Sequence, residues 1–368
     1  MNYLIVCNTP YQVFNAINIL VNDVEIVHSN CDVLIDETFN AFVDAKKIGM
    51  RLIEYEVCRS VYYTKEKKCM LMQSKMETFL YLKKNDHTEE YTFSDTKLLN
   101  IHYDAILVGD TNHIGSSFIY RNSNCEVIWY DDGLSSYAKS PRNFGNKLTL
   151  DIIMRILRLA SYSYKPQKLY VNNVSLAKTK EFALVQLPGF DENNRAKNIE
   201  KKIFGYFDER SEVKNYDYVY LGQLLETIEG YTGIPVRNFI HEMKKNGVHP
   251  IIRKHPRERV NFEGYKIDDG TNMWELECLE GVSNGHVLIA CCSTAQLTPK
   301  MIGGKEPYLI FLYKILIKNE SSRYKAYEEI VDDVINMYSQ KCKIFVPNNM
   351  DEFSQSIKKI KEEKEKSK

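Results

Sequence analysis

The sequence lacks any long hydrophobic run. Its most apolar stretches, Val287–Cys292 and Tyr308–Ile317, are far shorter than the roughly 20 residues of a membrane-spanning helix, and Lys314 interrupts the second. No basic segment precedes the short apolar run Leu4–Val6, so the N-terminus predicts a first β-strand rather than a signal peptide. We therefore expect a cytoplasmic protein. A peripheral contact at the inner face of the cell membrane stays open.

An excess of charge of one sign is also missing. The 49 Lys and Arg residues balance 49 Asp and Glu residues, so the bulk charge does not indicate a nucleic-acid partner. The nine cysteines show no CxxC spacing, which argues against a zinc site or disulfide framework and favours reduced thiols. Walker A, GxGxxG, HExxH and GxSxG motifs are absent. We expect neither a cofactor nor a metal requirement.

What the sequence does contain is an alternation of short β-rich runs with helical patterns, typical of parallel sheets covered by helices. The first half predicts strands at Tyr3–Cys7, Val24–Val27, Val33–Ile35, Arg51–Tyr55, Ala105–Val108 and Val127–Tyr130. Helices are predicted there at Tyr11–Leu20, Lys67–Lys84 and Asn112–Arg121. The polar passage Asp191–Lys214 follows.

After that passage the alternation resumes. It predicts strands at Tyr218–Leu221, Pro250–Arg253, Val287–Cys291, Tyr308–Leu312 and Ile344–Val346, and helices at Arg237–Lys245, Thr294–Ile302 and Arg323–Tyr338. The sequence therefore predicts an α/β protein of two Rossmann-like, doubly wound domains facing a central cleft. They span residues 1–205 and 206–348, and a C-terminal helix follows over 349–368. Ligands of such sheets bind at the carboxyl ends of strands, so the loops after strands matter most.

The first candidate catalytic group follows the predicted strand Val127–Tyr130. Asp131 and Asp132 point to opposite sides as the strand ends, and Gly133 permits a tight turn. One carboxylate can then be held by backbone donors while the other faces the cleft and accepts a proton from an alcohol. A plain Asp-Gly turn with a helix cap is the alternative.

A second group is the loop after the strand Pro250–Arg253. Pro256 favours extended geometry for His255, which presents the imidazole at the strand end. Nearby cations favour the neutral imidazole unless a bound phosphate reverses the balance; they are Arg253, Lys254, Arg257 and Arg259. A second His-Pro begins at His249, before the strand, and we interpret His249 as structural.

A third group stands at a predicted helix start. Ser293 and Thr294 follow an apolar strand, and hydroxyls at a helix N-terminus can bind phosphate. Simple N-capping is the competing interpretation. Between the second and third groups, Glu275 or Glu277 can bind a ribose diol, although carboxylates on a surface helix are commoner.

The turn between the first strand and the first helix also faces the predicted cleft. Pro10 suits a first helical turn, and polar groups are offered by Asn8, Thr9 and Gln12. We expect them, like Gly133, to line that cleft.

In their order along the chain, Asp131-Asp132-Gly133, His255-Pro256 and Ser293-Thr294 resemble the motifs of bacterial sialyltransferases. The opening Leu4–Gln12 is similar to that of glycosyltransferase family 52, the lipooligosaccharide and capsule sialyltransferases. The sequence departs from the pattern in having Ser-Thr instead of two serines. The resemblance implies a GT-B fold with an N-terminal acceptor domain and a C-terminal nucleotide-sugar domain.

The resemblance also implies an activity: inverting, metal-independent transfer of sialic acid from CMP-sialic acid to a terminal sugar, such as galactose, of a bacterial surface glycan. Asp132 would be the general base, with Asp131 as the next candidate. His255 would protonate or hydrogen-bond the departing CMP phosphate. The remaining donor contacts would come from Ser293, Thr294, Glu275 or Glu277, Pro256, and Arg253 or Arg257.

Other functions stay open beside this one. A hexosyltransferase or CDP-polyol transferase with a similar two-domain frame would share a histidine-containing phosphate site. A non-catalytic glycan-binding scaffold would need neither Asp132 nor His255. The sequence also leaves open whether the protein forms a homodimer.

Overall fold

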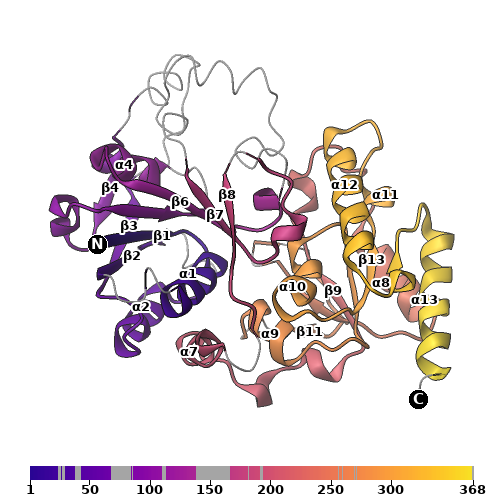
Figure 1. Ribbon diagram of the computed structural model, residues 1–368. Coiled ribbons are helices and arrows are strands. Elements are labelled where there is room, and N and C mark those ends of the chain that lie inside the picture. The colour runs from indigo at the N-terminus through magenta and orange to yellow at the C-terminus, as the bar shows by residue number, and fades with distance from the viewer. Residues whose placement is uncertain are drawn as a thin grey trace. The chain divides into compact units, whose positions relative to one another are not determined.

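The structure is a computed structural model that describes residues 1–23, 26, 30–37, 43–67, 84, 86–109, 113–137, 166–180, 182–190, 194–255, 257–258, 260–268, 270 and 272–366. It divides into two compact units, Met1–Phe204 and Gly205–Lys368 (Figure 1). The predicted strand Val24–Val27 and the predicted helix Lys67–Lys84 lie almost entirely outside the described residues.

The described part of the first unit contains an eight-stranded sheet in the order β4-β3-β2-β1-β5-β6-β7-β8. Neighbouring strands are parallel, except that β4 pairs antiparallel with β3. The strands are β1 (Asn2–Cys7), β2 (Asn30–Asp36), β3 (Ser60–Glu66), β4 (Tyr91–Phe93), β5 (Ala105–Val108), β6 (Glu126–Tyr130), β7 (Lys168–Val171) and β8 (Ala183–Gln186). The winding direction reverses between β1 and β5, so a topological switch point lies at their carboxyl ends.

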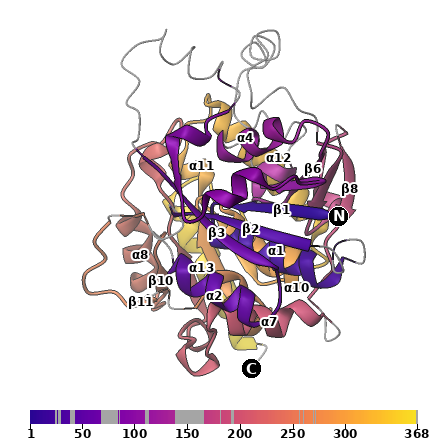
Figure 2. The same cartoon turned by 90° about the vertical axis from the view of Figure 1, so that its left-hand side faces the viewer.

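Helices cover both faces of this sheet. In Figures 1 and 2, α1 (Pro10–Asn22) and α2 (Ala45–Glu54) lie on one side and α4 (His113–Arg121) on the other. Helix α7 (Arg195–Phe204) ends the unit, and short 3₁₀ turns are η2 (Thr88–Glu90), η3 (Thr96–Asn100), η4 (Leu134–Tyr137) and η6 (Val174–Leu176). Helix α1 starts as expected, since Thr9 Oγ1 accepts the Gln12 N–H and Pro10 occupies the first turn.

One predicted strand is wrong. The segment Arg51–Tyr55 forms the end of α2, which Asp44 caps by accepting the Lys47 N–H at 3.1 Å. Buried Ile48 and Leu52 lie four residues apart, whereas Ile53 is 42% exposed. This helical spacing of buried side chains outweighs the short apolar pair that suggested a strand.

The polar passage Asp191–Lys214 also contains more structure than its composition indicates. Helix α7 lies within it and buries Ala196 and Ile203. The Arg51 guanidinium donates to the Ile203 carbonyl at 2.7 Å, which ties the end of α7 to α2. The first unit therefore extends to Phe204.

The described part of the second unit contains a six-stranded parallel sheet in the order β11-β10-β9-β12-β13-β14. Its strands are β9 (Tyr218–Leu221), β10 (Ile251–Arg253), β11 (Ile267–Asp268), β12 (Val287–Ala290), β13 (Tyr308–Phe311) and β14 (Ile344–Phe345). Its helices are α8 (Val236–Lys245), α9 (Trp274–Glu280), α10 (Thr294–Gly303), α11 (Tyr313–Leu316), α12 (Ser322–Met337) and α13 (Met350–Lys366), with 3₁₀ turns η7 (Asp208–Arg210), η8 (Val213–Asn215), η9 (Leu225–Thr227) and η10 (Lys341–Lys343). The switch point of this sheet lies between β9 and β12.

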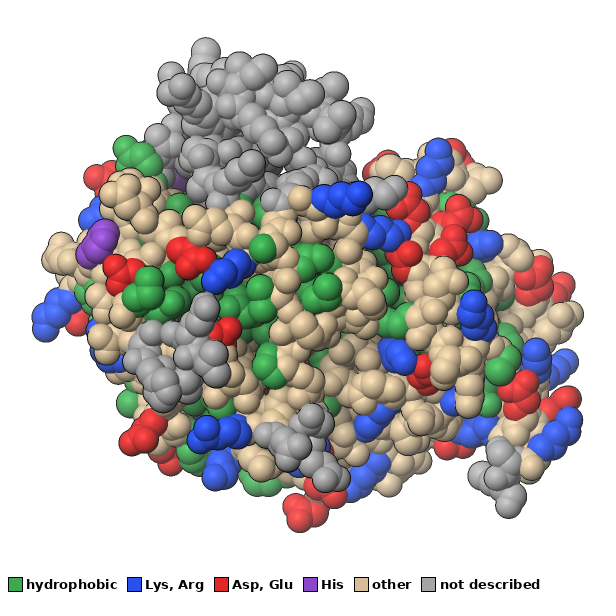
Figure 3. Space-filling view, viewed as in Figure 1, with side chains coloured by type: hydrophobic (Ala, Val, Ile, Leu, Met, Phe, Trp, Pro, Cys, Tyr) green, Lys and Arg blue, Asp and Glu red, His purple; other side chains and the backbone are tan. Residues whose placement is uncertain are grey.

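The C-terminal helix α13 belongs to the second unit. It buries Phe353, Ile357 and Ile360, which share one face of the helix, and the Phe353 ring contacts the Phe239 ring of α8 with centroids 5.3 Å apart. Basic and acidic side chains are interspersed over the face seen in Figure 3. Among the described residues, no helix has both the length and the apolar character needed to cross a bilayer.

The thiols of the described cysteines are free. Burial raises the pKa of Cys7 to about 12 and, followed in size by the nearby Asp32 carboxylate, raises that of Cys31 to about 12. Both thiols are therefore protonated at neutral pH and act as small apolar side chains.

Glu306 joins the start of β13 to the segment that follows α12. Its Oε1 accepts from Lys300 Nζ at 2.6 Å, and its Oε2 accepts from Ser339 Oγ at 2.5 Å. Burial by itself raises the pKa of this carboxyl, but the hydrogen bonds from Lys300, Ser339 and Gln340 outweigh it and lower the pKa to about 2.

Replacing Glu306 by Gln is expected to lower the free energy of unfolding at pH 7 by about 1.5–3 kcal/mol, the usual value for hydrogen bonds to a charged group. The pKa is lower in the folded state, so this stability is present above about 4.5 and is lost as the pH falls toward 2. In urea unfolding, the free energies of unfolding of the wild type and of Glu306→Gln should therefore become equal as the pH falls toward 2. The matched control is Glu263→Gln at an exposed position. If the stability difference between the wild type and Glu306→Gln were the same at all pH values, the prediction would be contradicted.

Candidate active site

In the first unit, Asp131 and Asp132 follow β6 at the carboxyl edge of the sheet. Asp131 is fully buried, and its carboxylate accepts the Gly133 N–H at 2.8 Å, Asn172 Nδ2 at 3.0 Å and the Tyr137 hydroxyl. Burial raises the pKa of Asp131, and these hydrogen bonds oppose the rise. Gly133 has φ of 101°, which strongly favours glycine at this turn. Asp131 therefore holds the turn together.

Asp132 is half-buried, and its orientation is set by Gln12. Its Oδ1 accepts from Gln12 Nε2 at 2.8 Å, while Gln12 Oε1 accepts the Asn8 N–H at 2.6 Å. A Cβ at Gly109, just after β5, would lie 2.5 Å from Gln12 Nε2, so glycine there makes room for the amide. Three loops at the switch point thus place one carboxylate, which is in position to act as a general base.

Asn172 supports the same arrangement and was not predicted from the sequence. It follows β7, and its Nδ2 lies 3.1 Å from the Tyr11 hydroxyl and 3.0 Å from Asn15 Oδ1. Asn15 Nδ2 in turn donates to the Asp131 carbonyl at 2.9 Å. The sequence signal for this residue is the polar pair Asn172-Asn173 after the short apolar run Leu169–Val171. No strand was predicted over that run, so the pair was not identified as a strand end.

In the second unit, His255 follows β10 at the carboxyl edge of the sheet and is half-buried. Its Nδ1 accepts the Arg257 N–H at 3.2 Å. Burial and, second, the Arg257 charge lower the pKa of His255, so the imidazole is neutral at neutral pH. His249 lies before β10 instead, at the opposite edge, where it lines a cavity of about 350 Å³ with Tyr218 and Lys364.

The cations near His255 differ in what they contact. Arg253 donates to Asp268 Oδ2 and to the Asn272 carbonyl, both at 2.5 Å, and its guanidinium lies 5.3 Å from the Trp274 ring centre. These contacts hold the Arg253 side chain inside the unit. Arg257 is exposed, whereas Pro256 and Arg259 lie outside the described residues.

Ser293 is the N-cap of α10. Its Oγ accepts the Ala295 N–H at 3.3 Å, and its own N–H donates to Gln296 Oε1 at 3.4 Å. The capping interpretation therefore holds for Ser293, and Thr294 is the first residue of the helix. Gln223, which follows β9, accepts the Cys292 N–H through Oε1 at 3.2 Å and donates from Nε2 to the Cys292 carbonyl at 2.9 Å. These two hydrogen bonds join the loops at the switch point.

The two predicted ribose ligands have different surroundings. Glu277 is 2% exposed and accepts from Ser211 Oγ at 2.6 Å and Asn272 Nδ2 at 2.8 Å, so it is held inside the unit. Glu275 is half-buried, and burial raises its pKa to about 7. Of the pair, only Glu275 is a residue partly open to solvent.

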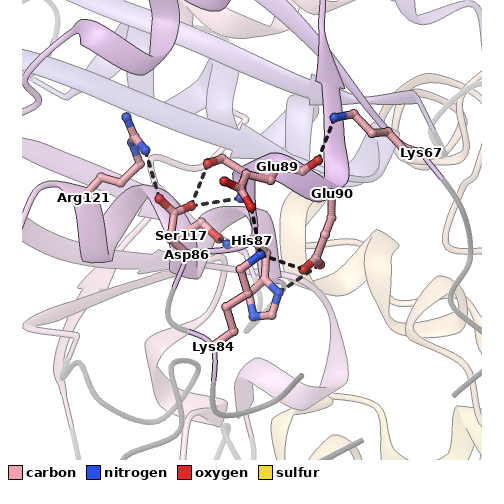
Figure 4. A network of polar contacts seen from close by, with 9 residues as sticks. Lys67, Lys84, Asp86, His87, Glu89, Glu90, Ser117 and Arg121 are labelled. Atoms are coloured by element: carbon pink, nitrogen blue, oxygen red, sulfur yellow. Dashed lines mark hydrogen bonds and ion pairs between the residues drawn. The ribbon is translucent and has the colours of Figure 1, made fainter. Parts of the chain in front are cut away.

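A further polar network, seen in Figure 4, joins the segment before β4 to α4 and to Lys67, which follows β3. His87 is buried, with Nδ1 2.9 Å from Glu90 Oε2, and its N–H donates to Ser117 Oγ at 2.8 Å. Ion pairs between Lys84 and Glu90 (3.3 Å) and between Arg121 and Asp86 (2.9 Å) complete it. These contacts fasten the edge strand to the unit. Within the described residues no cluster of His, Cys, Asp and Glu fits a metal ion.

No family model matches the sequence, and no curated protein matches it either. Among solved structures, the chain is similar to the glycotransferase of kitacinnamycin, at 9% identity and a TM-score of 0.50, over 98% of this chain and 90% of that one. It is also similar to spinosyn forosaminyltransferase, at 12% identity and a TM-score of 0.49, over 100% of this chain and 95% of that one. A third similar structure is the GT-B domain of a Photobacterium damselae sialyltransferase, at 11% identity and a TM-score of 0.47, over 94% of this chain and 100% of that one. The likeness to the first structure concerns the fold alone: the chain has the two α/β units of the GT-B fold.

Proposed function

We propose that the protein is an inverting, metal-independent sialyltransferase. It transfers sialic acid from CMP-sialic acid to a terminal galactose of a bacterial surface glycan, and it works in the cytoplasm. The observation that carries the proposal is Asp132, a half-buried carboxylate that Gln12 orients at the switch point of the first sheet. The ordered Asp-Asp-Gly, His-Pro and Ser-Thr motifs support the choice of donor.

The reaction needs one proton acceptor and one stabilised leaving group. Asp132 takes the proton of the acceptor hydroxyl as that oxygen forms a bond to the anomeric carbon of sialic acid. The bond from this carbon to the phosphate oxygen breaks, and CMP leaves with the electron pair. Negative charge grows on the phosphate, so donors already in place there lower the barrier.

The second unit offers such donors at its own carboxyl edge. With Nδ1 accepting the Arg257 N–H, the neutral imidazole of His255 carries its proton on Nε2 and can donate it to the phosphate. The first turn of α10 adds the positive end of a helix dipole together with Thr294. Glu275 supplies a carboxyl for the ribose hydroxyls.

The deciding experiment is an assay of CMP release. The protein is incubated with CMP-sialic acid, with and without a galactoside acceptor, and free CMP is measured. Acceptor-dependent CMP release supports the proposal. If CMP binds no better than UDP or CDP in calorimetry and no CMP is released, the donor assignment is wrong.

The roles of Ser293 and Thr294 can be separated. Thr294→Val should weaken CMP binding by about 1–3 kcal/mol while leaving cytidine, which lacks the phosphate, almost unaffected. Ser293→Ala should chiefly lower the free energy of unfolding by about 1 kcal/mol, since it removes the cap of α10. Calorimetry with both ligands and urea unfolding measure these effects. Equal weakening of CMP and cytidine by Thr294→Val would show that Thr294 does not contact phosphate.

A further inference from the structure

The turn that carries His255 is closed by hydrogen bonds to Glu258. The Glu258 N–H donates to the His255 carbonyl at 2.8 Å, and Glu258 Oε2 accepts the His255 N–H at 3.2 Å. Between these residues the Arg257 N–H donates to His255 Nδ1. Both the backbone and the ring of His255 are thus held by Arg257 and Glu258.

Glu258 is an unusual residue to find in this place. It is 7% exposed, and its Oε1 is buried with no hydrogen-bond partner among the described residues. Burial raises the pKa of its carboxyl, and Glu226 adds to the rise, while the His255 N–H and Lys254 oppose it. Burying a carboxylate oxygen without a hydrogen-bond partner is destabilising. A purely structural turn would not need such a group.

Gly222, the residue after β9, makes room for this carboxylate. A Cβ at Gly222 would lie 2.0 Å from Glu258 Oε2 and 2.8 Å from the His255 nitrogen. The Gly222 N–H also donates to the Arg253 carbonyl at 2.8 Å, which joins the end of β9 to the end of β10. The carboxylate is therefore wedged between two strand ends and the histidine backbone.

We propose that Glu258 is a positioning residue for His255: seated against Gly222, it fixes the turn 255–258 so that the imidazole is the neutral Nε2–H tautomer. The role of the Nε2 proton, donation to the leaving phosphate, rests on the proposed function. Protonation of Nδ1 would set two donors face to face, because the Arg257 N–H already points at that nitrogen. The neutral ring therefore donates a hydrogen bond without first having to gain a proton.

Among the described residues, the charged groups that act on this turn come from two segments, the loop after β10 and η9. Arg257 acts on the imidazole, and Lys254 and Glu226 act on the Glu258 carboxyl, with Glu226 contributed by η9. When Glu258 is removed, the ring is free to leave its partly buried position. The His255 titration should then move upward, toward that of an exposed histidine.

The first test reads the tautomer directly and needs no activity. In protein labelled with ¹⁵N-histidine, the His255 resonances are identified by their loss in His255→Gln. We expect a bare Nδ1 and a protonated Nε2 in the wild type, and a mixture of tautomers with an upward-shifted titration in Glu258→Ala and Gly222→Ala. Protonated Nδ1 in the wild type, or folded variants with unchanged tautomer and titration, would overturn the proposal. Failure of the CMP-release assay would leave this result untouched.

The second test is kinetic. Glu258→Ala and Gly222→Ala should each lower kcat by up to about 10²-fold through misplacement of His255, with little change in KM for the donor. Glu258→Gln keeps an oxygen for the His255 N–H and should restore most of the rate. The double variant should be no slower than either single one, since both act on one contact. The control is Gly303→Ala, whose Cβ would make only an ordinary 3.5 Å contact. Additive losses, or a Glu258→Gln variant as slow as Glu258→Ala, would refute the positioning role.

Discussion

Replacing Asp132 by Asn is expected to lower turnover by about 10²–10⁴-fold, the usual contribution of a general base, while CMP affinity stays near the wild-type value. The substitution preserves shape, and the new amide oxygen can still accept from Gln12 Nε2. What is lost is the ability to take the proton of the acceptor hydroxyl. Turnover is measured as acceptor-dependent CMP release, and affinity by calorimetry.

The neighbouring carboxylate provides the matched control. Asp131→Asn should chiefly lower the free energy of unfolding, because Asp131 is fully buried and accepts from Gly133, Tyr137 and Asn172. Its activity per folded molecule should exceed that of Asp132→Asn. Near-normal turnover in Asp132→Asn would remove Asp132 from the role of base and make Asp131 the next candidate.

The elements predicted well from the sequence are those with unbroken apolar runs. Strand β5 coincides with the predicted Ala105–Val108, and β12 ends one residue before the predicted Val287–Cys291. Such runs are buried on both faces, and turn residues bound them, so the pattern is unambiguous. Strand β8 was missed because it has only four residues, none of them buried, at the edge of the sheet. Helix α9 was missed because its seven residues are too few to show a helical pattern.

The candidate site was predictable as a set of strand ends but not as a set of contacts. Asp132 and Gln12 were both expected at carboxyl ends, yet their hydrogen bond joins residues 120 positions apart and depends on the order β1-β5-β6. Arg253 or Arg257 was expected to contact the donor, and nothing in the local sequence indicates that Arg253 has an ion-pair partner inside the unit. That partner, Asp268, lies in the two-residue strand β11, which has no recognisable pattern.

Replacing His255 by Ala should reduce turnover with the natural donor by about 10²–10⁴-fold, because the departing phosphate loses its proton or hydrogen-bond donor. A donor with an intrinsically better leaving group needs less stabilisation and should lose much less. His255→Gln separates the two roles, since its amide donates a hydrogen bond but cannot transfer a proton. Substantial activity in His255→Gln would match a neutral donor, as the Arg257 N–H on Nδ1 indicates.

The pH dependence of turnover also separates the two roles of His255, proton transfer and hydrogen-bond donation. Burial and Arg257 lower the pKa of His255 in the free protein, whereas a bound phosphate raises it. An imidazolium acid would lose rate as the pH rises through the raised pKa, while a neutral Nε2–H donor keeps its rate there. His249→Ala is the internal control, because His249 is exposed and lies before β10 rather than after it. It should change neither turnover nor its pH profile. If the two alanine variants lose activity alike, or the better leaving group restores nothing, His255 does not act on the leaving phosphate.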